Sequence, residues 1–316
     1  MVTIERRQRK SPVLSGASLP CLGEMPTINI TGGCGMDCVY CYTQSYPSHP
    51  GPGHVVLYDN IPDLVRRELA GRRSIPERVY FSTASDAFAL SREIQDVTFD
   101  TMKVLLEHGV GVSFLTKGYS HPRFDALFAA HPGRVFARIG ITTLDRGIWR
   151  TLEPTTTSPQ RRLEFAVRLR AAHVDVAARL DPLVPDLTDT PENLAPLFAA
   201  MADGGIVRAA ASYLFVRPAF AERVGRTLAL PQLLGSPTSE RWPWHRFSKG
   251  VGGGRMIDDA ERVERFGRLR ELATSHGIEL TACACKNSDV AGHGYCGIAG
   301  PKQTTTVLQT PTLFDS

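Results

Sequence analysis

Three cysteines lie close together near the start of the chain, in the stretch NITGGCGMDCVYCYTQ. Cys34, Cys38 and Cys41 place three thiolates where one loop can wrap around one face of an iron–sulfur cubane. A four-iron cluster usually takes four cysteine ligands, so three leave one iron open to bind something else. The flanking glycines allow the tight turns that such a bulky group requires. A zinc site is the alternative, although zinc knuckles favour paired ligands with a fourth one nearby.

A second group of cysteines follows a strand-like segment late in the chain. Cys283, Cys285 and Cys296 lie in the glycine-rich stretch CACKNSDVAGHGYC. Side chains alternate along a strand, so Cys283 and Cys285 point in the same direction and are suited to joint metal ligation. Cys21 is the remaining thiol and a candidate fourth ligand. The group therefore predicts an auxiliary iron–sulfur cluster, with a zinc site or a hydrogen-donating cysteine as the alternatives.

The composition is typical of a globular protein with one large domain. The chain has 316 residues, of which 42% are hydrophobic, and a formal net charge of +4. That charge is too small to indicate nucleic-acid binding by itself, and the basic run from Arg6 to Lys10 is interpreted as a solvated tail. No apolar run is long enough to predict a membrane span, and the first residues lack the apolar core of a secretion signal. We therefore expect a cytoplasmic protein, in which grouped thiols indicate metal or redox chemistry rather than disulfides.

Strand-like and helix-like segments alternate about six times along the chain. This order predicts a parallel sheet with crossover helices, curved or closed into a barrel. The strand candidates are residues 27–31, 79–82, 112–116, 135–141, 174–180 and 210–216. The helix candidates are residues 61–71, 94–109, 158–173, 190–205 and 258–277, which carry caps, early prolines or terminal glycines.

The chain is expected to divide into three regions. They are an N-terminal extension over residues 1–26, an α/β core over 27–216, and a C-terminal extension over 217–316 that carries the second cysteine group. After residue 217 the alternation stops. Residues 235–256 are rich in Gly, Pro and Ser, contain Trp242 and Trp244, and predict a long irregular connection.

The first cysteine motif, GGCGMDCVYCY after the first strand, resembles the radical S-adenosylmethionine (SAM) superfamily. Roughly residues 10–190 resemble its spore photoproduct lyase-like branch, through KSPVL, FSTASDAF, FLTKG, ARIGITTLD, LEPTTTSPQRRLE and DPLVPDLTD. The resemblance implies a partial (β/α)6 radical SAM barrel and a [4Fe–4S] cluster on Cys34, Cys38 and Cys41. It also implies that the fourth iron binds the amino and carboxylate groups of SAM, and that Tyr40 lies beside the adenine.

Hydroxyl and ammonium groups at the strand ends are candidates to bind SAM, because barrels keep their sites at the carboxyl ends of their strands. Ser82, Thr83 and Ser85 end the second strand and are placed to bond the methionyl amino group or carboxylate, with ordinary turn chemistry as the alternative. Lys117 ends the third strand and is a candidate partner of the carboxylate.

Two arginines within the predicted strands are candidates for the same carboxylate. Arg138 lies in the fourth strand and could bind it in a bidentate way. Arg179 lies in the middle of the fifth strand, where an unpaired charge would be costly, so we expect an anion beside it. An ion pair of Arg179 with Glu153 or Asp181 is the alternative, and Glu153 with Arg162 could form a pair at a helix end.

The resemblance also implies a reaction. An electron from the reduced cluster cleaves SAM to methionine and a 5′-deoxyadenosyl radical, which abstracts hydrogen from a substrate, and a flavodoxin- or ferredoxin-type protein supplies the electron. In spore photoproduct lyases a cysteine after the second strand donates hydrogen to the product radical. The matching position here is Thr83, whose O–H bond is too strong for that role.

A small biosynthetic molecule is therefore the expected substrate, and no catalytic residue is assigned from the sequence. One alternative is a nucleic acid or protein substrate that docks on ERWPWHRFSK and the basic N-terminal run. The others are a non-standard cleavage of SAM with group transfer, and a cluster that serves only as a redox sensor.

Overall fold

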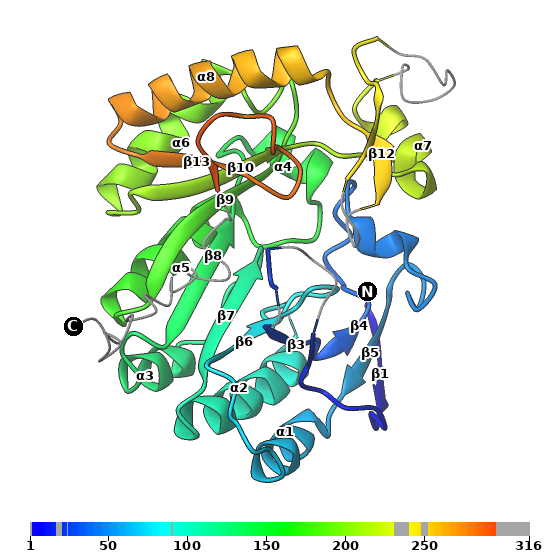
Figure 1. Cartoon of the computed structure of the whole chain (residues 1–316), viewed down its shortest axis with the longest axis vertical. Coiled ribbons are helices and arrows are strands. Elements are labelled where there is room, and N and C mark those ends of the chain that lie inside the picture. The colour runs from blue at the N-terminus through cyan, green and yellow to red at the C-terminus, as the bar shows by residue number, and fades with distance from the viewer. Residues whose placement is uncertain are drawn as a thin grey trace, which may run out of the picture.

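One large, mostly parallel sheet organises the chain (Figure 1). The computed structural model describes residues 2–16, 21–23, 25–89, 91–230, 240–247 and 252–294. Within these ranges the sheet has nine strands in the order β14-β13-β10-β9-β8-β7-β6-β3-β2, and all neighbouring pairs from β3 to β14 are parallel. The strands are β2 (Ser15–Gly16), β3 (Pro26–Ile28), β6 (Arg78–Phe81), β7 (Gly111–Thr116), β8 (Val135–Gly140), β9 (Asp175–Leu183), β10 (Arg208–Tyr213), β13 (Glu279–Cys283) and β14 (His293–Gly294).

Helices connect these strands and cover one face of the sheet (Figure 1). Strand residues on that face are apolar and fully buried, as Val79 and Phe114 are, and the ring of Phe114 stacks on that of Phe128 in a crossover helix. The helices are α1 (Ile61–Ala70), α2 (Arg92–Glu107), α3 (Arg123–Ala129), α4 (Arg146–Leu152), α5 (Pro159–Ala171), α6 (Pro191–Asp203), α7 (Pro218–Thr227) and α8 (Asp259–Ser275). The predicted α/β class and the five helices expected from the sequence are confirmed.

The other face of the sheet curves inward. Tyr80 of β6, Leu115 of β7 and Ala210 of β10 belong to one small cluster that also contains Cys21 and Cys283. Side chains from β6 and β10, which are not neighbours in the sheet, meet in one cluster because the sheet bends around them. Among the described residues no ladder joins the edge strands β2 and β14. The sheet is an open barrel, as the resemblance implied.

The expected strand over residues 27–31 is wrong in its second half. The chain leaves the main sheet after Ile28, and Thr31–Gly32 (β4) pairs instead with β5 (His54–Tyr58), a strand that the sequence did not predict. The departure occurs at Asn29, whose side chain binds the loop after β6 rather than continuing the ladder.

The basic N-terminal run is not a solvated tail. Thr3–Arg7 forms β1, which pairs in parallel with β5 in a separate three-stranded sheet. Arg6 pairs with Glu93 and Arg7 with Glu5, at 2.7 Å each. The arginine side chains are exposed, while the backbone between them is hydrogen-bonded to β5. The sequence did not predict this strand because its residues are charged rather than apolar.

The region after residue 217 is more ordered than expected. It contains α7 and a two-stranded ribbon of β11 (Trp244–Arg246) and β12 (Gly253–Arg255). Trp242 is 1% exposed and packs in the core, whereas Trp244 is 52% exposed. In addition, β13 extends the main sheet beside β10. Among the described residues, no helix combines the length and apolar composition that a membrane crossing requires.

Candidate active site

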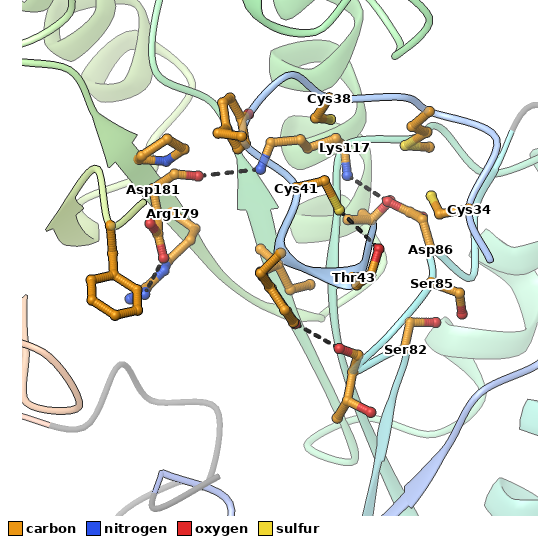
Figure 2. Close-up of a pocket in the computed structure, with 18 of the residues that line it drawn as sticks. Cys34, Cys38, Cys41, Thr43, Ser82, Ser85, Asp86, Lys117, Arg179 and Asp181 are labelled. Atoms are coloured by element: carbon orange, nitrogen blue, oxygen red, sulfur yellow. Dashed lines mark hydrogen bonds and ion pairs between the residues drawn. The ribbon is translucent and has the colours of Figure 1, made fainter. Parts of the chain in front are cut away.

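A cavity of about 280 Å³ lies at the carboxyl ends of the parallel strands (Figure 2). Cys34, Cys38 and Cys41 all line it. Figure 2 shows these cysteines along one side of the cavity, with Arg179 and Asp181 across from them. The sequence prediction that three thiols of one loop share a site at the barrel mouth agrees with this placement.

The cysteine loop is held by its own turns and by the end of α4. Gly33 has φ +78°, and a Cβ there would lie 2.6 Å from the Pro50 ring, so the turn into Cys34 requires glycine. The backbone N–H of Val39 donates to the carbonyl of Leu152 at 2.9 Å. The glycine turn and this hydrogen bond therefore support the backbone that presents the three thiols.

Tyr40 lies between the second and third cysteines and connects the loop to a buried ion pair. Its hydroxyl donates to Glu153, and Glu153 pairs with Arg162. The side chains of Glu153 and Arg162 are 4% and 1% exposed. Burial opposes ionisation of Glu153, but Arg162 and Lys117 together hold the pKa of its carboxyl below the usual range. Of the two pairs considered for Glu153 from the sequence, the structure has the one with Arg162. Arg179 pairs with Asp181 instead.

Two hydroxyls in the loop after β6 are buried beside the cavity and have no partner among the described residues. The Oγ atoms of Ser82 and Ser85 are buried and have no hydrogen-bond partner, and both residues line the cavity. Ser82 has φ +69°, an unusual conformation for a residue other than glycine. A buried hydroxyl without a partner costs about 1–3 kcal/mol, so both positions are suited to a polar ligand.

Thr83 differs from its two serine neighbours. Its Oγ1 accepts a hydrogen bond from the side-chain amide of Asn29 at 3.1 Å, and its carbonyl accepts one from the Tyr42 hydroxyl at 2.6 Å. Asn29 also accepts from the backbone N–H of Ala84 at 2.8 Å. Thr83 lines the cavity, but its hydroxyl is already used to fix the loop.

Asp86 is a buried carboxylate on the cavity wall that sequence reasoning did not identify. It accepts from the Thr116 hydroxyl at 2.7 Å and from the backbone N–H groups of Lys117 and Phe88 at 2.8 Å each. Burial raises the pKa of its carboxyl despite these donors. Asp86 joins the ends of β6 and β7, and in doing so fixes Lys117. The sequence signal was its position within FSTASDAF, four residues after a strand end.

Cationic side chains occupy the opposite wall. Arg179 pairs with Asp181 at 2.7 Å, and Lys286 lies 3.4 Å from the other oxygen of Asp181. The Nζ atom of Lys117 lies 3.3 Å from the Asp181 carbonyl and 5.5 Å from the centroid of the Tyr40 ring. Burial disfavours the charged form of Asp181, yet Lys286 and Arg179 hold the pKa of its carboxyl below the usual range. Arg179 therefore has both features considered from the sequence, a place in the cavity and an ion pair with Asp181.

Arg138 lies elsewhere, so its assignment to the carboxylate of SAM is a correction. Its side chain does not line the cavity; it pairs with Asp175, the first residue of β9, at 3.0 Å. Arg208 binds the same carboxylate oxygen at 2.7 Å. Arg138 points to the inside of the barrel but toward the opposite end of the strands, where such pairs support stability rather than chemistry.

The second thiol set lines the same cavity as the first. Cys21, Cys283 and Cys285 all lie on its wall, and Cys21 and Cys283 are 8% and 2% exposed. Cys296 lies outside the described residues. Within the described part of the chain, no three His, Cys, Asp or Glu side chains converge closely enough to hold a single metal ion. A cluster does not require such convergence, because each thiolate binds a different iron.

The described side chains fit a four-iron cluster with SAM bound beside it. Three thiols on one preformed loop supply ligands for three irons. Ser82 and Ser85 offer buried hydroxyls without partners among the described residues, and Lys117 offers a cation in the same cavity.

The family is decided by comparison with known proteins. The model of the radical SAM superfamily matches residues 28–196. The chain belongs to the radical SAM superfamily. The matched segment runs from the end of β3 into α6 and contains the three clustered cysteines, so the resemblance seen in the sequence is confirmed at the level of the superfamily.

Relatives in sequence carry no assigned activity. An uncharacterized protein of Mycobacterium bovis and two of Mycobacterium tuberculosis are each 29% identical over 190 residues, covering 57% of this chain and 55% of theirs. The chain thus spans about half the length of these curated relatives.

Solved structures show the same fold. A variant of spore photoproduct lyase with bound AdoMet and a dinucleoside spore photoproduct has a TM-score of 0.66 at 19% identity, covering 88% of this chain and 81% of that one. A radical SAM methyltransferase from Sphaerobacter thermophilus has a TM-score of 0.51 at 16% identity, covering 83% and 67%. At these identities the likeness concerns the fold, and the radical SAM barrel expected from the sequence is confirmed.

Proposed function

We propose that the protein is a radical SAM enzyme that cleaves SAM reductively in this cavity and abstracts hydrogen from a small-molecule substrate. The observation that carries the proposal is the meeting of three loop thiols with two buried, unpartnered hydroxyls, those of Ser82 and Ser85. When bound, the reduced [4Fe–4S] cluster would supply an electron to the sulfonium of SAM and so yield methionine and a 5′-deoxyadenosyl radical.

The chain's own contribution is binding and orientation. Ser82 and Ser85 would bond the amino group or carboxylate of SAM, and Lys117 would offset the carboxylate charge. Tyr40, anchored by Glu153, would lie against the adenine. Apolar side chains, among them Met36, Leu115 and Phe215, also line the cavity and would help to keep water from the reacting atoms.

A small substrate is supported by the charge of the far wall. Arg179 and Lys286 both pair with the carboxylate of Asp181, so two cationic side chains line this part of the wall. A substrate with a carboxylate or phosphate would complement it. The engagement of the Thr83 hydroxyl with Asn29 also speaks against a lyase-type hydrogen donor at that position. The electron would come from a flavodoxin- or ferredoxin-type protein in the cytoplasm.

The test is to incubate anaerobically reconstituted, dithionite-reduced protein with SAM and to measure 5′-deoxyadenosine and methionine. We expect both products in equal amounts from the wild type and neither from Cys38→Ala. A gel-shift titration with single- and double-stranded nucleic acid addresses the substrate class. Tight, salt-sensitive binding there would contradict the small-molecule assignment.

A further inference from the structure

Three cysteines from distant segments meet inside the barrel, apart from the radical SAM motif. Cys21 precedes β3, Cys283 ends β13, and Cys285 follows it by two residues. Cys21 and Cys283 pack with Tyr80 in one cluster, against which Cys285 lies. These three thiols lie on the wall of the cavity that Cys34, Cys38 and Cys41 also line. Thiols that approach one another from opposite ends of a reduced cytoplasmic chain indicate a metal site.

The turn that carries two of these thiols is rigidly built. Asn287 is fully buried, and its side-chain N–H group donates to the carbonyl of Cys283 at 2.8 Å. The backbone N–H of Ala284 donates to the carbonyl of Gly294 at 2.9 Å, which ties the turn to β14. Supporting bonds of this kind orient ligands before metal binds, and they are a regular part of metal sites.

The charges around this wall suit an anionic group. Lys286 follows Cys285 directly and lines the cavity, and Arg179 lies across Asp181 from it. Thiolates bound to a cluster in a buried setting need nearby cations, because buried negative charge is costly when it is not compensated. Lys286 and Arg179 place two such cations on the described part of this wall.

We propose that Cys21, Cys283 and Cys285 bind a second iron–sulfur cluster on the cavity wall, facing the radical SAM cluster. The inference deepens the proposed function, since it places a second metal centre in the substrate cavity. The three thiolates would bind three irons of a four-iron cluster and hold it at the wall of the cavity in which the substrate would bind. An extended cluster, rather than a single zinc ion, fits thiols that do not converge on one point.

The test compares iron, zinc and acid-labile sulfide per chain in three reconstituted proteins. We expect about eight irons in the wild type and about four in each of two triple variants, Cys34→Ala/Cys38→Ala/Cys41→Ala and Cys21→Ala/Cys283→Ala/Cys285→Ala. Ser288→Ala, an exposed change in the same loop, should retain the wild-type iron content. Circular dichroism and size-exclusion chromatography establish that each variant is folded.

The outcomes separate the two claims. If the first triple variant is folded and holds no iron, or holds one zinc, the second cluster is refuted while the proposed function stands. If the Cys21→Ala/Cys283→Ala/Cys285→Ala variant holds about four irons but its spectrum does not change when SAM is added, the proposed function is refuted instead. Should a triple variant not fold, iron and sulfide per chain of the wild type decide, with the Mössbauer spectrum showing that the iron is in four-iron clusters. About eight irons support two clusters, and about four overturn the inference.

Discussion

The guanidinium of Arg223 on α7 donates to both the side-chain and the main-chain oxygen of Asp37, at 3.0 and 2.8 Å. It also donates to the side chain of Gln44 at 2.9 Å. Asp37 lies between the first two loop cysteines and has φ +42°, so it needs outside support to keep its conformation. A helix beyond the family-matched segment therefore holds the loop that carries the radical SAM thiols.

The contact predicts that Arg223→Ala lowers retention of the cluster without unfolding the protein. Asp37 would lose its partner, and the loop would open more often to solvent and oxygen. We expect a several-fold shorter half-life of the iron–sulfur absorbance in air. Arg226→Ala is the control. Arg226 lies one turn after Arg223 on α7, and its described ion pair is with the exposed Glu222, so this variant should behave as the wild type. Equal half-lives for the two variants would contradict the role given to Arg223.

The unpartnered hydroxyls predict opposite effects on stability and on SAM binding. Ser82→Ala and Ser85→Ala remove buried groups that lack partners in the protein, so the melting temperature without SAM should stay level or rise. The Kd for SAM should increase roughly 10- to 150-fold, as loss of one hydrogen bond to a charged group costs about 1.5–3 kcal/mol. Isothermal titration under anaerobic conditions measures it. A lower melting temperature with unchanged SAM affinity would assign both serines to the structure alone.

The close approach of Gly118 to the loop after β6 predicts an effect on stability. A Cβ at Gly118 would lie 2.0 Å from the carbonyl oxygen of Phe88, which cannot move without displacing the backbone beside Asp86. Gly118→Ala should cost about 3 kcal/mol of unfolding free energy or more. Gly267→Ala is the control. Gly267 lies in the middle of α8 on its exposed side, and a Cβ there would contact nothing, so the change should stabilise the protein by up to about 1 kcal/mol. Denaturant unfolding compares the two.

The buried pair of Glu153 and Arg162 predicts a pH-dependent effect. Glu153→Gln leaves Arg162 buried without its counter-charge and should destabilise the protein by about 3–5 kcal/mol at neutral pH. The pKa of Glu153 is depressed in the folded state, so its contribution is present above the unfolded pKa of about 4.3 and is lost as the pH falls through the folded pKa.

The difference in unfolding free energy between wild type and Glu153→Gln should therefore shrink on acidification. Denaturant unfolding at neutral pH and below pH ~4 measures it. Glu222→Gln, whose pair with Arg226 is exposed, should differ from the wild type by less than about 1 kcal/mol throughout. A difference that grows as the pH falls would have the wrong sign for a depressed pKa.

Local patterns were sufficient to predict six strands of the main sheet, five of the eight described helices and the cysteine loop. Spacing alone placed Cys34, Cys38 and Cys41 on one loop, and the strand-end rule placed Ser82 and Lys117 on the cavity wall. The same rule failed for Arg138, because inward orientation does not specify depth along a strand. Arg138 lies at the base of the barrel, beside Asp175.

Features that depend on contacts between distant segments could not be predicted. α7 has no side-chain cap that would mark its start in the sequence. The helix supports the cysteine loop through the ion pair of Arg223 with Asp37, which no local pattern reveals. Asp86 owes its position to backbone amides from the next strand. Cys21 was expected beside Cys283 only because it is the remaining thiol, and the contact itself depends on the curvature of the whole sheet. Each of these is a tertiary contact that neither periodicity nor motif spacing encodes.

The measurement that tests the central claim most directly is the electron paramagnetic resonance spectrum of the reduced protein, recorded before and after SAM is added. The Cys21→Ala/Cys283→Ala/Cys285→Ala variant isolates the cluster on Cys34, Cys38 and Cys41. We predict that SAM changes the g-values of this cluster, because its amino and carboxylate groups bind the open iron. An unchanged spectrum at saturating SAM, from protein with about four irons per chain, would contradict the account.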